Sequence, residues 1–233
     1  MLTEPELRPL ALVTGASRGI GAAVARALAP TYDLLLGGRD TAALQALAVE
    51  LPGSRPWPVE LTDGVAVAEA VGGIERLDVL VHSAGIGVLG TVAETTAGTW
   101  RRQFEINVVA VAELTRLLLP ALRAARGRVV LLNSGAGLNA RPGWGAYAAS
   151  KHALRAFADS LRDEEAHNGV RVTSIHPGRV DTEMQRTVVA HEGGEYHPAS
   201  YLRPETVAGA VLFAASAPDD AALTEMVLRP TGV

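Results

Sequence analysis

Several features that mark particular classes of protein are missing from this sequence. It contains no cysteine, which excludes disulfide bonds and thiolate metal sites. No apolar run approaches the roughly 18 residues that a membrane-spanning helix requires. Positive and negative side chains are interspersed and the net charge is −4, which argues against a nucleic-acid or anionic-membrane surface. Acidic residues and prolines precede any apolar run within residues 1–9, so we expect no signal peptide and a cytoplasmic protein.

What the chain does contain is a composition suited to one large α/β domain. Its 233 residues are 48% hydrophobic and 20% charged, so the chain can bury a sizeable core and is not expected to be disordered. We expect residues 1–233 to form a single domain. The six histidines are scattered without an H-x-x-x-H pattern, so we expect no metal site.

Strand and helix patterns alternate along the chain, which indicates a parallel sheet with both faces covered by helices. Short apolar runs that end at glycine, proline or polar residues predict the strands. These are Leu10–Thr14, Asp33–Leu36, Arg55–Val59, Leu77–Val81, Arg128–Leu132, Val170–Ile175 and Glu225–Leu228. The segments between them predict helices that end near Ala29 and His167 or cover residues 41–51, 64–73, 96–125 and 203–215.

A glycine-rich turn follows the first predicted strand. Gly15, Gly19 and Gly21 lie between that strand and an alanine-rich helix, which is the context that a nucleotide-binding loop requires. Glycines let the backbone approach a pyrophosphate, whose charge the N–H groups at the helix start can receive. The alternative is a turn that serves only packing.

Basic residues indicate which dinucleotide would bind. Arg39 follows the second predicted strand, where a carboxylate would bind the ribose 2′-hydroxyl and an arginine a 2′-phosphate. Arg18 in the glycine turn could reach the same phosphate, so we predict NADP in preference to NAD. Asp40 could instead hold the ribose hydroxyls, but we interpret it as the N-cap of the next helix. A solvated surface position is the alternative for Arg39.

Tyr147 and Lys151 stand one helical turn apart, so their side chains lie on the same helix face. An ammonium close to a phenol lowers the pKa of the phenol, which would make Tyr147 a general acid/base near neutral pH. The pair Tyr-x-x-x-Lys also arises by chance on amphipathic helices. Its context favours chemistry, because Ser134 follows the fifth predicted strand just before this helix.

The other chemical features also follow predicted strand ends, where ligands bind on parallel sheets. Residues 83–85 follow the fourth strand, and Pro177 and Gly178 follow the sixth. His82 is interpreted as a structural histidine. In the helix of residues 96–125, Asn107 is either functional or a polar surface residue, and Pro120 is expected to kink or end the helix.

Residues 179–203 show no clear period, and their length favours a mobile lid over a substrate. The side chains of this segment mix apolar, aromatic and charged groups, which indicates an amphipathic substrate. They include Met184, Val188, Val189, His191, Glu195, Tyr196 and Tyr201.

Together these residues resemble the short-chain dehydrogenase/reductase family, and the resemblance covers nearly the whole chain. TGASRGIG at residues 14–21 is similar to the family's cofactor loop, and Ser134 with Tyr147 and Lys151 matches its Ser, Tyr-x-x-x-Lys set. The segment PGRVDT at residues 177–182 is similar to the P-G-x-V-x-T that follows the family's sixth strand. The resemblance implies a Rossmann-like sheet, a nicotinamide dinucleotide, and hydride exchange with a carbonyl or alcohol carbon.

The resemblance also implies roles for individual residues. Tyr147 would donate the proton to a carbonyl oxygen, and Ser134 would hydrogen-bond the same oxygen. Lys151 would bind the nicotinamide ribose and lower the pKa of Tyr147, while Asn107 would hold a water that links Lys151 to solvent. The implied cofactor contacts are Gly15, Ser17, Arg18, Gly19, Ile20, Gly21, Arg39, Glu60, Leu61, Ser83, Ala84, Gly85, Tyr147, Lys151, Pro177, Gly178, Val180 and Thr182.

Some positions depart from the family's pattern. His82 and Ser83 replace the two asparagines of N-N-A-G, and Glu60 stands where an aspartate usually contacts adenine. The segment 229–233 lacks the extension that some members fold over a neighbour's site. Pairing through two long helices, which is common in the family, implies a homodimer or homotetramer.

We therefore predict an NADP(H)-dependent oxidoreductase that acts on a small carbonyl/alcohol pair. The alternative is a dinucleotide-binding regulator with dispensable chemistry, but the intact Ser134, Tyr147 and Lys151 argue against it. A related epimerase or dehydratase would resemble a different glycine pattern and carry a longer C-terminal region.

Overall fold

The fold was determined as a computed structural model, which describes residues 8–231. In that part of the chain seven strands form one parallel sheet, in the order β3-β2-β1-β4-β5-β6-β7. The predicted fold class is therefore confirmed. Predictions that concern residues 1–7 and 232–233 lie outside the described residues. The strands are β1 (Leu10–Val13), β2 (Asp33–Gly38), β3 (Ser54–Pro58), β4 (Val79–His82), β5 (Arg128–Leu132), β6 (Arg171–Pro177) and β7 (Glu225–Leu228).

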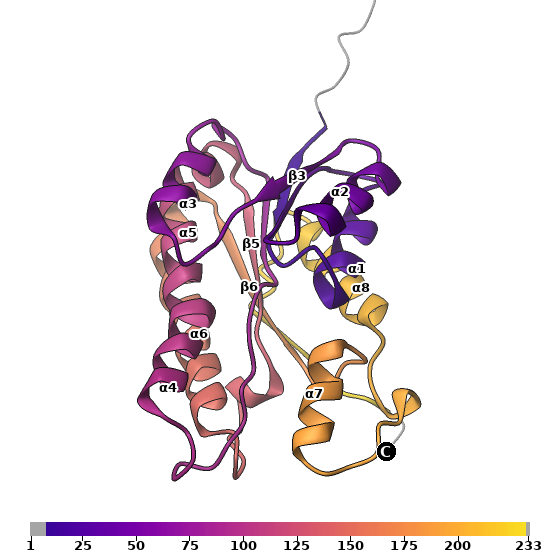
Figure 1. The fold of residues 1–233 in the computed structure, drawn as a ribbon. Coiled ribbons are helices and arrows are strands. Elements are labelled where there is room, and N and C mark those ends of the chain that lie inside the picture. Colours follow the sequence, from indigo (N-terminus) through magenta and orange to yellow (C-terminus); the bar gives the residue numbers. More distant parts are fainter. Residues whose placement is uncertain (1–7, 232–233) are drawn as a thin grey trace, which may run out of the picture.

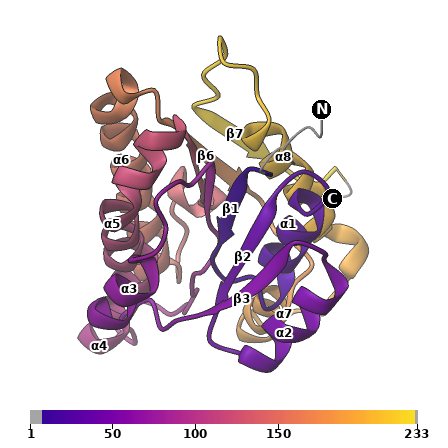
Figure 2. The same ribbon diagram turned by 90° about the horizontal axis from the view of Figure 1, so that it is seen from above.

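Helices cover both faces of the sheet, as Figures 1 and 2 show. Apolar side chains alternate between two cores along the buried strands, so that Ala11 and Val13 face one layer while Leu12 faces the other. One layer contains α1 (Gly19–Leu28), α2 (Thr41–Glu50), α7 (Glu183–His191) and α8 (Pro204–Ala215). The other contains α3 (Gly64–Val71), α4 (Ala97–Phe104), α5 (Ala110–Ala125) and α6 (Gly145–Glu165). Within residues 8–231, no helix combines the length and apolarity needed to cross a bilayer.

The strand order reverses between β1 and β4. The chain first builds the sheet outward from β1 to β3, then returns to place β4 against the other edge of β1. Loops that leave neighbouring strands toward opposite helix layers open a crevice at the carboxyl ends of the strands. This reversal places the glycine turn beside residues 83–85, because the positions of Gly15 and Ala84 are in contact.

Some predicted strand boundaries are shifted by one or two residues. Strand β4 begins at Val79 and includes His82, and β6 continues to Pro177 because it pairs with β7 as far as Leu228. Such shifts are common because tertiary pairing, and not local propensity, decides where a ladder ends.

Pro120 does not end its helix, contrary to one predicted outcome. It lies inside α5, which continues to Ala125. Pro120 and Arg116, whose carbonyl loses its partner, are both exposed, so water can bond the freed group. Leu118 and Leu122 are buried against the sheet on the opposite side of the helix. Their packing outweighs the roughly 3 kcal/mol cost of a proline in a helix.

Candidate active site

The turn between β1 and α1 is built from close backbone contacts. Gly15 has a φ of +67°, and a Cβ there would lie 2.9 Å from the backbone of Ala84. A Cβ on Gly21 would lie 2.1 Å from the carbonyl oxygen of Gly15, so both positions require glycine. In the described chain, α1 begins at Gly19 without a side-chain cap. Its first N–H groups therefore point outward as donors for an anion such as a pyrophosphate.

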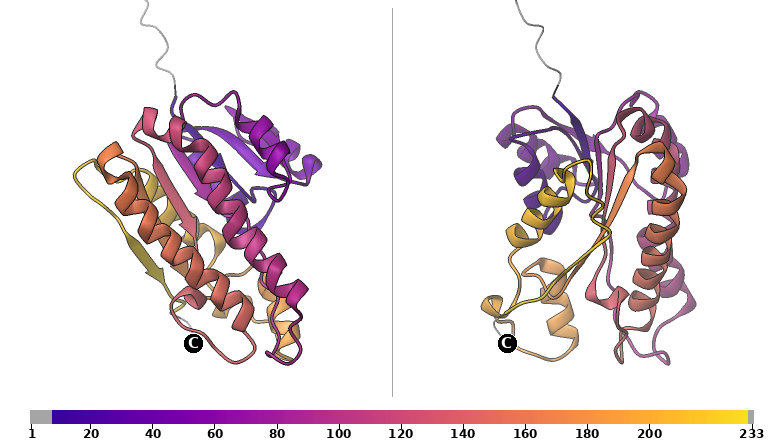
Figure 3. Two further views of the ribbon diagram at one scale, coloured as in Figure 1. Left: turned by 90° about the vertical axis from the view of Figure 1, so that its left-hand side faces the viewer. Right: turned by 180° about the vertical axis from the view of Figure 1, so that it is seen from behind.

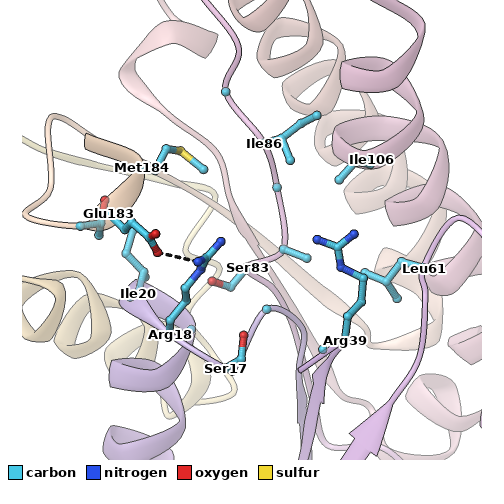
Figure 4. A pocket seen from close by; sticks show the side chains of 18 of the residues that line it. Ser17, Arg18, Ile20, Arg39, Leu61, Ser83, Ile86, Ile106, Glu183 and Met184 are labelled. Atoms are coloured by element: carbon cyan, nitrogen blue, oxygen red, sulfur yellow. Dashed lines mark hydrogen bonds and ion pairs between the residues drawn. The ribbon is translucent and has the colours of Figure 1, made fainter. Parts of the chain in front are cut away.

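A cavity of about 500 Å³ opens in front of this turn, and we call it the glycine-loop cavity (Figure 4). Residues that follow β1, β2, β3 and β4 meet here with the start of α7. The predicted cofactor residues that line it are Gly15, Ser17, Arg18, Gly19, Ile20, Gly21, Arg39, Glu60, Leu61, Ser83, Ala84, Gly85 and Thr182. Sequence reasoning assigned Met184 to the substrate lid, and it missed Gly38, Val59, Ile86, Gly87, Val88, Ile106, Glu183 and Thr187. Most of these are chain neighbours of predicted residues, which was the available signal.

Arg18 and Arg39 flank the glycine-loop cavity, and Figure 4 shows their guanidinium groups on either side of it. Arg18 Nη1 lies 2.5 Å from Glu183 Oε2, and Arg39 Nη1 lies 3.3 Å from Glu60 Oε2. Because the two arginine side chains are 74% and 68% exposed, each ion pair contributes at most about 1 kcal/mol. A phosphate dianion can therefore replace either carboxylate at little cost.

The two acids near the end of β2 and β3 have local partners. Asp40 Oδ1 accepts a hydrogen bond from the backbone N–H of Ala43 at 3.0 Å, which confirms its role as the N-cap of α2. Glu60 Oε1 accepts from the backbone and hydroxyl of Thr62. Burial alone would raise the pKa of Glu60, but the bonds from Thr62 and Arg39 lower it overall. Glu60 is therefore ionised and bonded to its own loop.

The end of β4 is fixed by Thr14 and by a buried histidine. Thr14 Oγ1 accepts hydrogen bonds from the backbone N–H groups of Ser83 and Ala84, each at 3.1 Å. His82 is buried, with Nε2 2.9 Å from Thr115 Oγ1, a hydroxyl that itself donates to a backbone carbonyl. His82 therefore donates from Nε2, and burial lowers its pKa to about 3. The interpretation of His82 as a structural residue is confirmed.

Asn107 is buried where three parts of the site meet. It lies in a π-helical turn, Glu105–Val109, which joins α4 to α5. Its Oδ1 accepts from the backbone N–H of Ile86 at 2.9 Å, and its Nδ2 donates to the carbonyl of Ile86 at 2.9 Å. Nδ2 also donates to Ser150 Oγ on α6 at 3.0 Å. The alternative of a surface position is therefore wrong, and Asn107 ties the segment after β4 to α6.

Ser134 and Tyr147 come together from β5 and α6. Ser134 follows β5, and its Oγ accepts a hydrogen bond from the backbone N–H of Ala136 at 3.1 Å. Tyr147 is half-buried in the first turn of α6, with its ring centroid 5.8 Å from that of Trp144. Burial raises the pKa of Tyr147, and a hydrogen bond with Ser134 partly offsets the increase. The expected lowering of this pKa is not found, because desolvation of the phenol dominates.

Lys151 is buried one turn further along α6, with 5% of its surface exposed. Its Nζ donates to the carbonyl oxygen of Leu132, at the end of β5, at 2.9 Å. Burial lowers the pKa of Lys151 to about 8, so the amine is still mainly protonated at neutral pH. A Cβ on Gly85 would lie 3.1 Å from Asn107 Oδ1 and 3.9 Å from Lys151 Nζ. The ammonium and the Asn107 amide therefore lie behind Gly85, which lines the glycine-loop cavity, but Lys151, a predicted cofactor contact, lines neither cavity itself.

A second cavity of about 630 Å³ is lined by Ser134 and Tyr147, and we call it the Ser134–Tyr147 cavity. Its remaining walls include apolar and aromatic side chains such as Leu89, Trp144 and Val188. The predicted residues Pro177, Gly178 and Val180 line this cavity and not the glycine-loop cavity. The two cavities adjoin, because both are lined by Ile20, Gly87, Thr182 and Met184.

The segment 179–203 is more regular than its sequence indicates. It contains α7, which Thr182 caps by accepting a hydrogen bond from Gln185 N at 3.2 Å, and a 3-10 turn, Pro198–Ser200. Tyr196 anchors the segment by donating to Asp181, and Arg186 stacks on its ring at 4.2 Å. Three of the residues singled out for substrate contact line the Ser134–Tyr147 cavity: Met184, Val188 and Tyr201. Val189, His191, Glu195 and Tyr196 do not.

Acidic and histidine side chains do not gather into a possible metal site within residues 8–231. The site is instead a pair of adjoining cavities, one edged by glycines and arginines and the other by a hydroxyl, a phenol and aromatic rings.

Comparison with known proteins places this site in a family. Residues 9–193 match the family model of short chain dehydrogenases. The chain is 34% identical over 235 residues to glycine betaine reductase of Emericella nidulans, a match that covers 95% of this chain and only 18% of that longer protein. It is also 34% identical over 229 residues to an uncharacterized short-chain type dehydrogenase/reductase of Sinorhizobium fredii, which covers 96% of this chain and 92% of the relative.

A solved structure has the same fold. An alcohol dehydrogenase from the archaeon Thermococcus sibiricus, complexed with 5-hydroxy-NADP, superimposes with a TM-score of 0.87 at 28% identity, over 97% of each chain. Its fold therefore agrees with the parallel sheet described above over nearly the entire length. From the family match, the similar relatives and this shared fold, we conclude that the chain belongs to the short-chain dehydrogenase/reductase family of oxidoreductases.

Proposed function

We propose that this protein is an NADP(H)-dependent oxidoreductase that interconverts a carbonyl compound and an alcohol in the Ser134–Tyr147 cavity. The observation that carries the proposal is the meeting of Ser134 and Tyr147 on the wall of a cavity that adjoins the glycine-loop cavity. A hydroxyl and a phenol that both face one cavity can bond a single carbonyl oxygen. Tyr147 then donates the proton that the oxygen gains on reduction, and accepts it back on oxidation.

The glycine-loop cavity supports dinucleotide binding. Its glycine turn has no room for a Cβ at Gly15 or Gly21, and the start of α1 presents backbone donors to an anion. When bound, a nicotinamide dinucleotide supplies or accepts the hydride. The amine of Lys151 lies behind Gly85 and is mainly protonated at pH 7. It would hold the nicotinamide ribose and stabilise negative charge that develops on Tyr147.

Arg18 and Arg39 support NADP over NAD. Their guanidinium groups stand on either side of the glycine-loop cavity, and both are held only by exposed ion pairs. A 2′-phosphate would gain charge-assisted bonds from either group, whereas a 2′-hydroxyl would not replace the carboxylates of Glu60 and Glu183. The similar archaeal alcohol dehydrogenase is complexed with an NADP derivative.

We also propose that residues 179–203 act as a lid. Met184 from this segment lines both cavities, so movement of the segment would open both at once.

We propose further that the protein is a homodimer or homotetramer. Figure 3 shows α5 and α6 side by side along one face. Val109, just before the first turn of α5, is 50% exposed. Light scattering coupled to gel filtration measures the subunit number, and a monomer at micromolar concentration would contradict the assembly proposal.

A panel of ketones, aldehydes and alcohols followed at the NADPH absorbance band tests the proposed activity. We expect turnover of at least one carbonyl compound, and Ser134→Ala should reduce its kcat/KM by about 10- to 1000-fold because one donor to the oxygen is lost. Ser160→Ala is the matched control, since Ser160 lies exposed on the same helix as Tyr147, where it bonds Glu164. Equal kcat/KM values for the two variants would contradict the proposal.

A further inference from the structure

The Ser134–Tyr147 cavity carries an excess of positive charge. Three arginines, Arg141, Arg179 and Arg229, line it together with neutral residues. No aspartate or glutamate is among the described residues that line it. Low-dielectric walls strengthen the field of such charges, so the cavity favours a negatively charged occupant over a neutral one.

One of the three arginines is already neutralised. Arg179 Nη2 donates to both carboxylate oxygens of Glu192, at 2.6 and 2.7 Å. Arg141 and Arg229 have no carboxylate within ion-pair distance among residues 8–231. Both side chains are exposed, but they differ in how they are held. Arg141 lies in the loop before α6, whereas Arg229 is hydrogen-bonded to the backbone at the ends of β6 and β7. Arg229 therefore supplies the positive charge that is both unpaired and held in position in this cavity.

Arg229 is held beside the reacting groups. Its Nη1 donates to the carbonyl oxygens of His176 and Leu228, each at 3.0 Å. The guanidinium lies over Gly135, whose Cβ, if present, would be 3.3 Å from both Nη1 and Nη2. Gly135 directly follows Ser134 in the chain. The positive charge is therefore fixed one residue from the hydroxyl that we propose bonds the substrate oxygen.

The orientation of Arg229 suits a carboxylate. Nη1 is occupied by two backbone carbonyls, and no hydrogen bond found within residues 8–231 uses Nε or Nη2, which together carry two parallel N–H donors. Two parallel donors match the two oxygens of a carboxylate and form the bidentate pair that arginine makes with such groups.

We propose that the substrate is a carbonyl compound that carries a carboxylate close to its carbonyl, and that Arg229 binds this carboxylate. The inference rests on the proposed oxidoreductase function and names the substrate class of the same cavity. Arg229 is a specificity-determining residue: its charge orients the acid so that the carbonyl oxygen faces Ser134 and Tyr147. Arg141, in the exposed loop before α6, adds attraction without a fixed geometry.

The test compares two ligands that differ at one group, benzoylformate with its carboxylate and the uncharged methyl ester of the same acid. Both have the same ketone and a ring suited to the walls at Trp144 and Tyr201. Isothermal titration calorimetry measures their Kd values on the 233-residue chain, once with saturating NADP⁺ and once without any dinucleotide. Oxidised NADP⁺ cannot reduce the ketone, so binding is measured without turnover.

We expect the wild-type protein to bind the acid at least tenfold more tightly than the ester in both titrations. Arg229→Gln should bring this ratio close to one, and Arg229→Lys should retain part of it because the charge remains. Arg55→Gln is the charge-matched control: Arg55 is exposed on β3, at the opposite edge of the sheet from β7, and should leave the ratio unchanged.

A wild-type ratio near one, or no measurable binding of the acid, would overturn the proposal. A tenfold ratio that Arg229→Gln and Arg55→Gln reduce equally would overturn the assignment to Arg229. Failure of the oxidoreductase function looks different, because NADP⁺ would then not bind, or no carbonyl compound would consume NADPH. The titration without dinucleotide still decides the charge preference in that case.

Discussion

The two cavities of this protein are built in different ways. The glycine-loop cavity lies at the ends of four parallel strands, and part of its wall is close-packed backbone, where Gly15 approaches both Gly21 and Ala84 within contact distance. The Ser134–Tyr147 cavity is walled by side chains from loops and from α7, such as Trp144, Val188 and Tyr201. Backbone contacts restrict the sequence to glycine, whereas side-chain walls accept many residue types. The first cavity can therefore be predicted from a sequence motif, whereas the residues of the second can vary with the substrate.

The strongest test of this contrast is to add a methyl group to the glycine turn. In Gly21→Ala the new Cβ would lie 2.1 Å from the oxygen of Gly15, so the turn must move. We expect the unfolding free energy to fall by about 1–3 kcal/mol. We also expect the variant to lose NADPH binding. Gly209→Ala is the control, since its Cβ would meet no atom within 4 Å inside α8. Urea unfolding and NADPH titration measure both, and equal behaviour of the two variants would contradict the backbone account.

Acid should weaken the protein through His82, which is buried at the end of β4 against Thr115 of α5. Its folded pKa of about 3 lies below its ordinary value of 6.5, so only the unfolded chain binds a proton between these limits. The unfolding free energy should therefore fall by about 1.4 kcal/mol per pH unit below pH 6.5 on account of this residue.

Replacement of His82 sharpens that test. His82→Asn keeps a side-chain donor toward Thr115 and removes the titrating group, so its stability should depend less on pH between 7 and 5. The difference between wild type and variant, measured by urea unfolding at both pH values, should be about 2 kcal/mol. Parallel curves for the two proteins would contradict the lowered pKa, because they would mean that His82 takes up its proton equally in the folded and unfolded protein.

Arg39→Ala tests the charge at the outer end of the glycine-loop cavity. We expect wild type to bind NADPH at least tenfold more tightly than NADH, and the variant to lose most of that difference. A tenfold ratio corresponds to about 1.4 kcal/mol, the size expected for one charge-assisted contact with a phosphate. Fluorescence titration with both dinucleotides measures the ratio, and equal affinities in the wild type would contradict the preference for NADP.

The smallest effect concerns the segment that closes the second cavity. Tyr196→Phe removes the hydrogen bond to Asp181 and should lower the unfolding free energy by about 1 kcal/mol or less. We expect faster amide hydrogen exchange in α7 without a change in α6, because the lost contact anchors only residues 179–203. Uniformly unchanged exchange would indicate that the segment is held by its other contacts.

The sequence predicted those parts of the site that depend on strand ends. Alternating strands and helices placed Ser83, Ser134 and Pro177 at one edge of the sheet, and the structure brings them to the two cavities. Asp40 was correctly interpreted because an N-cap depends on a contact only three residues away. Local patterns succeed where the deciding contact is local.

The remaining features depend on contacts that are distant in the chain. Asn107 is buried because its amide bonds Ile86 and Ser150, which no periodicity in residues 96–125 reveals. Helix α7 was missed because two of its apolar residues, Met184 and Val188, face the cavities and not a continuous core. The pKa of Tyr147 was expected to fall because spacing showed Lys151 one turn away, but spacing does not show how far the phenol is desolvated.

Single-turnover reduction is the most direct test of the claim that Tyr147 carries the proton. Wild type and Tyr147→Phe, each saturated with NADPH, are mixed in a stopped-flow instrument with a carbonyl substrate found in the panel. Removing the proton donor should slow hydride transfer by about 100- to 10,000-fold. Tyr32→Phe, which removes a buried hydroxyl bonded to the carbonyl of Ala215, should react at the wild-type rate. A Tyr147→Phe rate equal to that of wild type would contradict the mechanism.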